Sequence, residues 1–227
     1  MNDTASAISQ LRSYRDKHLE LGPHLWRAGG GVLYPLDLLA TATLNRSVCL
    51  IRGYCDLIGS HNFVAAVPLL RLQIDNYLRF SAAWLVADPH ELAMQVLKGN
   101  PVKDQRDMSE HRMTDAHLVK ILAQKHPWLP NAYKEACAYV HLSEQHILNA
   151  VTARADSDGR GFTAKISDND EFVPDTARAE SVEVFDETTK AILTLVRAWA
   201  YAKEHPESLA NPDVWLDKDK QVAQLEN

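Results

Sequence analysis

One stretch of this sequence, residues 61–86, constrains the fold more than any other. It reads HNFVAAVPLLRLQIDNYLRFSAAWLV, and its apolar side chains recur at helical spacing on almost every side. A helix that is apolar nearly all round must be covered by neighbouring elements over most of its surface. We therefore predict that this segment is the central helix of a bundle.

Apolar residues recur with the period of a helix in the flanking segments as well. The turn before residue 61 is short, so the central helix and the helix preceding it should form an antiparallel hairpin. Residues 155–174 are rich in Asp and Gly and alternate in polarity at 162–166, which is typical of a surface loop or a small β-hairpin. The fold class that we expect is all-α, a bundle of about five long helices with this small insertion. The further helices are predicted at residues 4–21, 36–58, 90–98, 114–125, 131–153 and 175–204.

The length and composition favour one helical domain over residues 1–227. Hydrophobic residues make up 46% of the chain, which is enough for a sizeable core. We expect that core in residues 34–153 and 175–205, with residues 211–227 as a C-terminal tail. The net charge of −6 argues against a general nucleic-acid binder, because such proteins usually present a basic face.

Three sequence features place the protein in the cytoplasm. The first residues lack an apolar signal segment, and no stretch is apolar for long enough to cross a membrane. The three cysteines have no metal-ligand spacing and read as reduced thiols. His141 and His146 are five residues apart, and the chain has no HExxH motif, so we expect no metal and no cofactor.

Charged residues interrupt the central helix along one flank. Arg71, Asp75 and Arg79 follow one another at i, i+4 and i+8, so they lie one above the other. A buried charge is costly unless it is paired. The three residues therefore need partners from a neighbouring helix.

The helix predicted at residues 131–153 offers such partners. Tyr133 and Cys137 belong to its apolar stripe, whereas a different face carries polar groups flanked by alanines, which permit close approach. We predict that this face meets the charged row and forms a polar seam, which is either a hydrogen-bond network that fixes helix register or a pocket for a nucleotide or another small anionic molecule. The residues of the predicted seam are Arg71, Asp75, Arg79, Tyr139, Ser143 and His146.

A second candidate site lies around residue 114. Thr114 is expected to cap a helix, with Asp115 favourable in its first turn. Arg112 and His117 match the R-x4-H spacing of ribonucleases of the HEPN superfamily. That resemblance implies a metal-independent ribonuclease in which Arg112 stabilises phosphate charge and His117 transfers protons. Arg106 and His111 have the same spacing.

A wider resemblance covers about residues 36–153. The runs LLRLQIDNYLRF, MTDAHLVKIL and YKEACAYVHLSEQHI resemble a family of uncharacterised bacterial helical proteins, in which an Arg-x3-acid helix precedes a Tyr-x3-Ser-x2-His helix. The resemblance implies a HEPN-like helical bundle. The function that we expect is a cytosolic helical binding or interaction protein, acting as a homodimer, in a defence or stress system. The ribonuclease acting on RNA and the small-molecule pocket at the seam are the alternatives.

Overall fold

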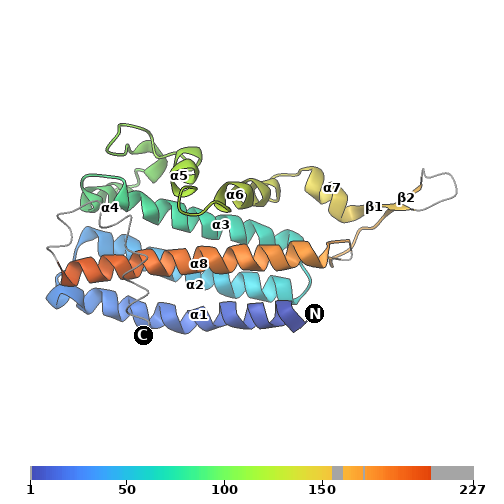
Figure 1. The fold of residues 1–227 in the computed structure, drawn as a ribbon, viewed down its shortest axis with the longest axis horizontal. Helices are drawn as coiled ribbons and strands as arrows, with labels where there is room; N and C mark the ends of the chain where they lie inside the picture. Colours follow the sequence, from blue (N-terminus) through green and yellow to red (C-terminus); the bar gives the residue numbers. More distant parts are fainter. Residues whose placement is uncertain (1, 155–160, 171, 206–227) are drawn as a thin grey trace.

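Four long helices lie side by side and form the body of the molecule (Figure 1). The structure is a computed structural model and describes residues 2–154, 161–170 and 172–205. Helix α3 packs against α2 and α8, and α1 packs against the same two helices. The described residues thus confirm the all-α bundle with a small β-hairpin. The long helices are α1 (Asn2–Arg27), α2 (Pro35–Gly59), α3 (Phe63–Ser81) and α8 (Asp175–Glu204).

Helix α3 corresponds to the predicted central segment. Its N-cap is Asn62, whose side chain accepts a hydrogen bond of 3.2 Å from the backbone N–H of Ala65. The helix ends at Ser81 and continues as a short 3-10 turn, Ala82–Trp84, so it stops earlier than the apolar pattern suggests. Residues Phe63, Ala66, Val67, Leu70, Ile74, Tyr77, Leu78 and Phe80 are buried.

Shorter helices pack outside the four long ones. Helices α5 and α6 cover the side of α3 that faces away from α1, and α4 packs against α2 (Figure 1). Asp88 caps α4, and Thr114 caps α5, both as expected from the sequence. Helices α5 and α6 contact α3 and each other, so they form an outer layer on the central helix. These elements are α4 (Pro89–Leu97), α5 (Asp115–Leu122) and α6 (Leu129–Ala138), with 3-10 turns at Ala28–Gly31 and Val102–Asp104.

The first helix is longer than predicted. The sequence Gly22-Pro23 was expected to end it near residue 21, yet α1 continues to Arg27 with Pro23 inside. Leu21 and Leu25 flank this pair and are both buried in the core. Tertiary packing of an apolar face supplies most helical stability in proteins, and here it outweighs the backbone hydrogen bond that the proline cannot make.

The prediction of one continuous helix over residues 131–153 is wrong. Helix α6 ends at Ala138, α7 covers Glu144–Ala150, and the chain then enters a strand. Strand β1 (Val151–Arg154) pairs antiparallel with β2 (Gly161–Ala164). No residue of α7 is buried, so no core packing holds this segment in line with α6. Helix α7 and the hairpin project from one end of the bundle, and we call residues 142–154 and 161–166 the arm (Figure 1).

A buried ion pair connects the last helix, α8, to the start of α2. Lys203 of α8 donates a 2.9 Å hydrogen bond to the Asp37 carboxylate at the start of α2 and a 2.8 Å bond to the backbone carbonyl of Leu25. Gly29 packs against the Lys203 backbone with a φ of 61°, and a Cβ there would lie 2.6 Å from the Lys203 carbonyl oxygen. Only glycine fits this turn between α1 and α2 without strain.

Candidate functional site

The charged row of α3 does find partners, but the described contacts come from other residues than the predicted ones. Arg71, Asp75 and Arg79 meet side chains from α2, α5 and α6, and together these form what we call the arginine–aspartate network. The three residues on α3 are neighbours in the network because they lie at i, i+4 and i+8. The network consists of Arg46, Arg71, Asp75, Arg79, Asp115, Tyr133 and Cys137.

Arg71 lies at the junction of α3, α5 and α6. Its Nη2 donates to Asp115 Oδ2 at 2.6 Å and to the Tyr133 hydroxyl at 2.9 Å. Its Nε donates to the Cys137 sulfur at 3.1 Å. The guanidinium also lies 4.3 Å from the centroid of the Tyr133 ring, a distance at which cation–π attraction contributes. Arg71 therefore holds both outer helices against the central one.

Asp115 is the acceptor that most of these donors share. It accepts hydrogen bonds from Arg71, from the Tyr133 hydroxyl at 2.8 Å and from Arg79. Burial alone would raise the pKa of Asp115, but the Tyr133 hydrogen bond and the two guanidinium charges outweigh burial and hold this pKa below its usual range. The carboxylate is therefore ionised throughout the physiological pH range.

The second half of the network is centred on Asp75. Its carboxylate accepts from Arg46 of α2 at 2.9 Å and lies 3.1 Å from Nε of Arg79. Three guanidinium groups thus surround two carboxylates, which leaves one formal positive charge in excess. Most of the charge is compensated inside the network. This arrangement favours a hydrogen-bond network that fixes the register of the helices over a pocket for a ligand.

The other half of the predicted seam lies elsewhere. Tyr139 follows the last residue of α6, and Ser143 caps α7 and donates to the Ala138 carbonyl at 2.8 Å. His146 Nδ1 accepts a 3.2 Å hydrogen bond from the Ser143 backbone N–H. Among the described hydrogen bonds and ion pairs, none joins Arg71 to these three residues. The expectation that Arg71 faces His146 required a straight helix over residues 131–153, and the break after Ala138 removes that geometry.

The sequence contains a signal for the observed partners of the charged row, but this signal lies outside the polar face of the predicted helix. Tyr133 and Cys137 are four residues apart and share a face of α6, but this face is apolar in the sequence and predicts core packing. A tyrosine in such a stripe usually brings its hydroxyl to a polar partner when it is buried. The helix dipole is sufficient to account for Asp115 in the sequence, but a carboxylate in the first turn can also accept hydrogen bonds from a neighbouring helix.

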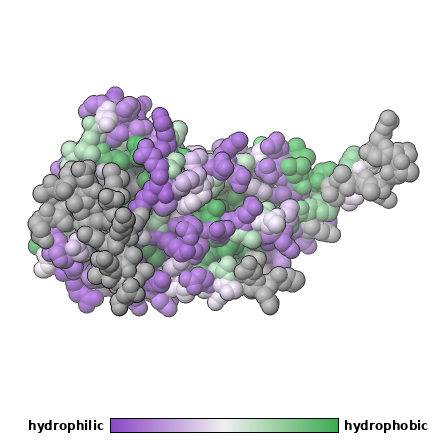
Figure 2. Space-filling view, viewed as in Figure 1, coloured by the Kyte–Doolittle hydropathy of each residue, from purple (hydrophilic) through white to green (hydrophobic). Residues whose placement is uncertain are grey.

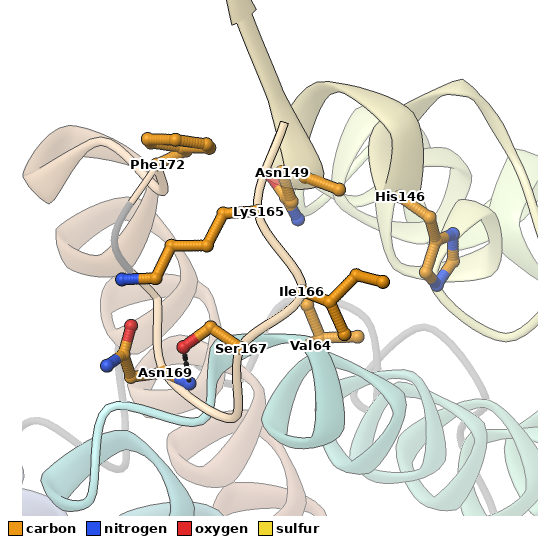
Figure 3. A pocket seen from close by; sticks show the side chains of 9 residues that line it. Val64, His146, Asn149, Lys165, Ile166, Ser167, Asn169 and Phe172 are labelled. Atoms are coloured by element: carbon orange, nitrogen blue, oxygen red, sulfur yellow. Dashed lines mark hydrogen bonds between the residues drawn. The ribbon is translucent and has the colours of Figure 1, made fainter. Parts of the chain in front are cut away.

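A shallow hollow lies between α7 and the segment that follows the hairpin (Figure 3). It has a volume of about 260 Å³, and its wall combines apolar side chains such as Val64 and Phe172 with His146, Asn149 and Lys165. Figure 3 shows Ile166 directed into the space between His146 and the chain that carries Lys165. The hollow is part of the base of the arm.

Arg112 and His117 are each held by a different carboxylate. Arg112 is exposed and donates to Asp104 at 2.9 Å. His117 is in the first turn of α5, and its Nε2 lies 2.7 Å from Asp107 Oδ2. No described hydrogen bond or ion pair joins Arg112 to His117, so their role as a catalytic pair stays a prediction.

Comparison with protein-family models, with curated proteins and with solved structures finds no match to this chain. Among the described residues, no helix is both long and apolar enough to cross a membrane. Any statement about function therefore depends on the residues and their geometry.

Proposed function

We propose that this chain is a helical binding protein that forms a homodimer through its projecting arm. The observation that supports the proposal is the exposure of large apolar side chains along the arm. Apolar patches of this kind on otherwise folded proteins mark interaction surfaces. Each of these side chains is more than half exposed: Leu142, Ile147, Leu148, Phe162 and Ile166.

The hydropathy of the surface agrees with this proposal. Hydrophobic surface gathers where the arm leaves the bundle, while hydrophilic residues and smaller hydrophobic patches alternate on the visible part of the bundle (Figure 2). The hollow beneath the arm adds Val64 and Phe172 to the same region. A partner docking here would cover a continuous apolar area that a single chain leaves in water.

The hairpin favours a second copy as the partner. β1 and β2 form a two-stranded sheet with four residue pairs, and an isolated two-stranded hairpin is only marginally stable in water. A twofold axis beside the hairpin would bring the same strand of another copy to its open edge and bury the apolar side chains of both arms at once. Most soluble oligomers have this self-complementary kind of interface.

We propose a HEPN-like class and a defence or stress setting for this role, as the sequence resemblance implies. The two alternatives have weaker geometric support. A ribonuclease needs Arg112 and His117 to act on one phosphate, and each already binds its own carboxylate. A pocket for an anion needs free donors on Arg71, whose Nε and Nη2 are engaged within the arginine–aspartate network.

Replacing Leu148 by glutamate is expected to weaken dimer formation. Burial of one leucine side chain contributes about 1.5–3 kcal/mol, and each 1.4 kcal/mol changes a Kd about tenfold, so Kd should rise by roughly tenfold or more. Sedimentation velocity at increasing protein concentration measures the change. The matched control is Leu97→Glu on α4, because Leu97 is 65% exposed and Leu148 is 60% exposed. A wild-type protein that stays monomeric, or equal effects of the two variants, would contradict self-association through the arm.

A further inference from the structure

A loop with several internal hydrogen bonds precedes α5 and carries Asp107 and His111 close to His117 in the first turn of that helix. Residues Arg106 and Arg112 form an isolated antiparallel β-bridge across the loop. Within it, Asp107 N–H donates to the His111 carbonyl at 2.9 Å, and Met113 N–H donates to the Gln105 carbonyl at 3.0 Å. These bonds give the loop a defined shape next to the first turn of the helix.

The carboxylate of Asp107 is buried at the centre of this loop. Its Oδ1 accepts from the backbone N–H groups of Ser109 and His111, each at 2.9 Å, and its Oδ2 lies 2.7 Å from His117 Nε2. Burial alone would raise the pKa of Asp107, but the hydrogen bonds from His117 and from the backbone outweigh burial and keep this pKa below its usual range. The group is therefore an ionised carboxylate at neutral pH.

The two imidazole rings approach this carboxylate together. The His111 and His117 rings are stacked, with centroids 5.2 Å apart and an angle of 26° between their planes. One ligand atom from each of Asp107, His111 and His117 lies within 4.8 Å of the other two. His111 comes from the loop and His117 from α5, so the sequence spacing alone does not indicate a shared site.

We propose that Asp107, His111 and His117 form a binding site for a divalent transition metal ion of the zinc class. Two imidazole nitrogens and one carboxylate oxygen are a donor set that Zn²⁺, Co²⁺ and related ions prefer, whereas Mg²⁺ and Ca²⁺ favour oxygen ligands. Three protein ligands leave a further coordination position, as in zinc sites that bind water or a small ligand. The side chain of His111 is 66% exposed, so an ion can reach the site from solvent.

The movement needed to bind an ion is small. At a metal–ligand distance of about 2.0–2.1 Å, two ligand atoms of a tetrahedral site lie roughly 3.3 Å apart. The His117 Nε2 and Asp107 Oδ2 atoms would therefore separate from 2.7 Å by a fraction of an ångström. His111 has a mostly exposed ring, so a rotation of its side chain can bring a nitrogen closer to the other two ligand atoms. The backbone hydrogen bonds to Asp107 would remain as support for the ligand.

Substitution of His111 can separate a metal site from a purely structural contact. The His117–Asp107 hydrogen bond would stabilise the fold even without an ion, because it connects the loop to α5. The side chain of His111 forms no hydrogen bond with a described residue, and its Nδ1 lies 3.8 Å from Asp107. Loss of this imidazole should therefore leave the fold intact and reduce only metal binding.

The test is titration of the full chain, freed of metal by a chelator, with Co²⁺ and then with Zn²⁺ in competition. Four-coordinate Co²⁺ with imidazole and carboxylate ligands absorbs visible light more strongly than the hydrated ion, so the spectrum reports the ligand geometry as well as the affinity. We expect one ion for each chain and displacement of Co²⁺ by Zn²⁺. His111→Ala should weaken binding by about tenfold or more, since loss of even a supporting residue at a metal site typically costs 10–100-fold.

His24→Ala is the matched control, because His24 is an exposed histidine on α1 outside the site. It should bind Co²⁺ as the wild type does. The same spectrum in His111→Ala as in the wild type would overturn the proposal, as would a wild-type protein that binds no Co²⁺. If His117→Ala fails to fold, His111→Ala still decides the outcome. At the same Zn²⁺ concentration, the thermal midpoint of the wild type should rise by more than that of His111→Ala.

Discussion

Replacing Lys203 by alanine is expected to lower the free energy of unfolding by about 3–5 kcal/mol, the usual effect of removing one partner of a buried ion pair. The Lys203 side chain is 0% exposed and that of Asp37 is 1% exposed. The substitution would leave Asp37 with hydrogen bonds from Trp199 Nε1 at 2.7 Å and from the Tyr34 backbone N–H at 2.8 Å, but without a cation. A buried carboxylate without a nearby cation raises the free energy of the folded state. Urea unfolding followed by circular dichroism measures the loss.

Lys190→Ala on the same helix is the control for this experiment. Lys190 pairs with Asp186 and Glu187 at 2.7 Å, but its side chain is 49% exposed. Exposed pairs contribute about 0–1 kcal/mol, so this variant should unfold near the wild-type midpoint. In the double variant Asp37→Asn with Lys203→Met, neither charge remains, and we expect its loss to be smaller than the sum of the two single losses. If Lys203→Ala were no less stable than Lys190→Ala, the burial of this pair would not matter energetically.

The second large effect is expected from Asp115→Ala, at about 2–4 kcal/mol. This range is below that for a fully buried pair because the Asp115 side chain is 25% exposed. The variant would leave Arg71, Arg79 and Tyr133 without their shared acceptor, and α5 would lose its ion pairs to α3. The control is Asp104→Ala, which removes an exposed pair with Arg112 and should cost no more than about 1 kcal/mol. Equal losses in the two variants would refute a stabilising role for the arginine–aspartate network.

The same carboxylate predicts how stability depends on pH. The pKa of Asp115 is lower in the folded protein than in the unfolded chain, so its contribution is fully present above the unfolded pKa of about 3.9. The contribution is lost as the pH falls through the depressed folded value. The difference in unfolding free energy between the wild type and Asp115→Asn should therefore be constant near neutral pH and shrink in strong acid. If the difference in unfolding free energy between the two proteins grew as the pH fell, the predicted direction of the pH dependence would be wrong.

Local signals in the sequence were sufficient for the bundle itself. The apolar period of α2, α3 and α8 predicts their existence because burial of an apolar face determines where helices form. Asp88 and Thr114 predict two helix starts, since each side chain accepts from the backbone N–H groups that a helix start leaves free. The alternation around Phe162 predicts the second strand of the hairpin, β2, whereas the first strand, β1, lies mostly in the segment predicted as helix.

The break between α6 and α7 was less visible. Ser143 and Glu144 form a cap signature, but the apolar pattern continues through them and favours one helix. Val151 joins a strand because it finds Ala164 across the hairpin. A strand exists only with its partner, so the competition between helix and strand at this point depends on residues beyond the local window.

The helical period of the sequence is sufficient to place Arg71, Asp75 and Arg79 on one flank of a helix, where they need partners. The identity of these partners depends on how the helices pack. Asp115 is 44 residues from Arg71 along the chain, and no periodicity relates the two. The loop before α5 likewise brings His111 and His117 beside Asp107 through its own backbone hydrogen bonds. Periodicity in a sequence predicts one helix or strand at a time. A site forms where loops and packing bring several helices or strands together, and this placement depends on the free energy of the whole fold.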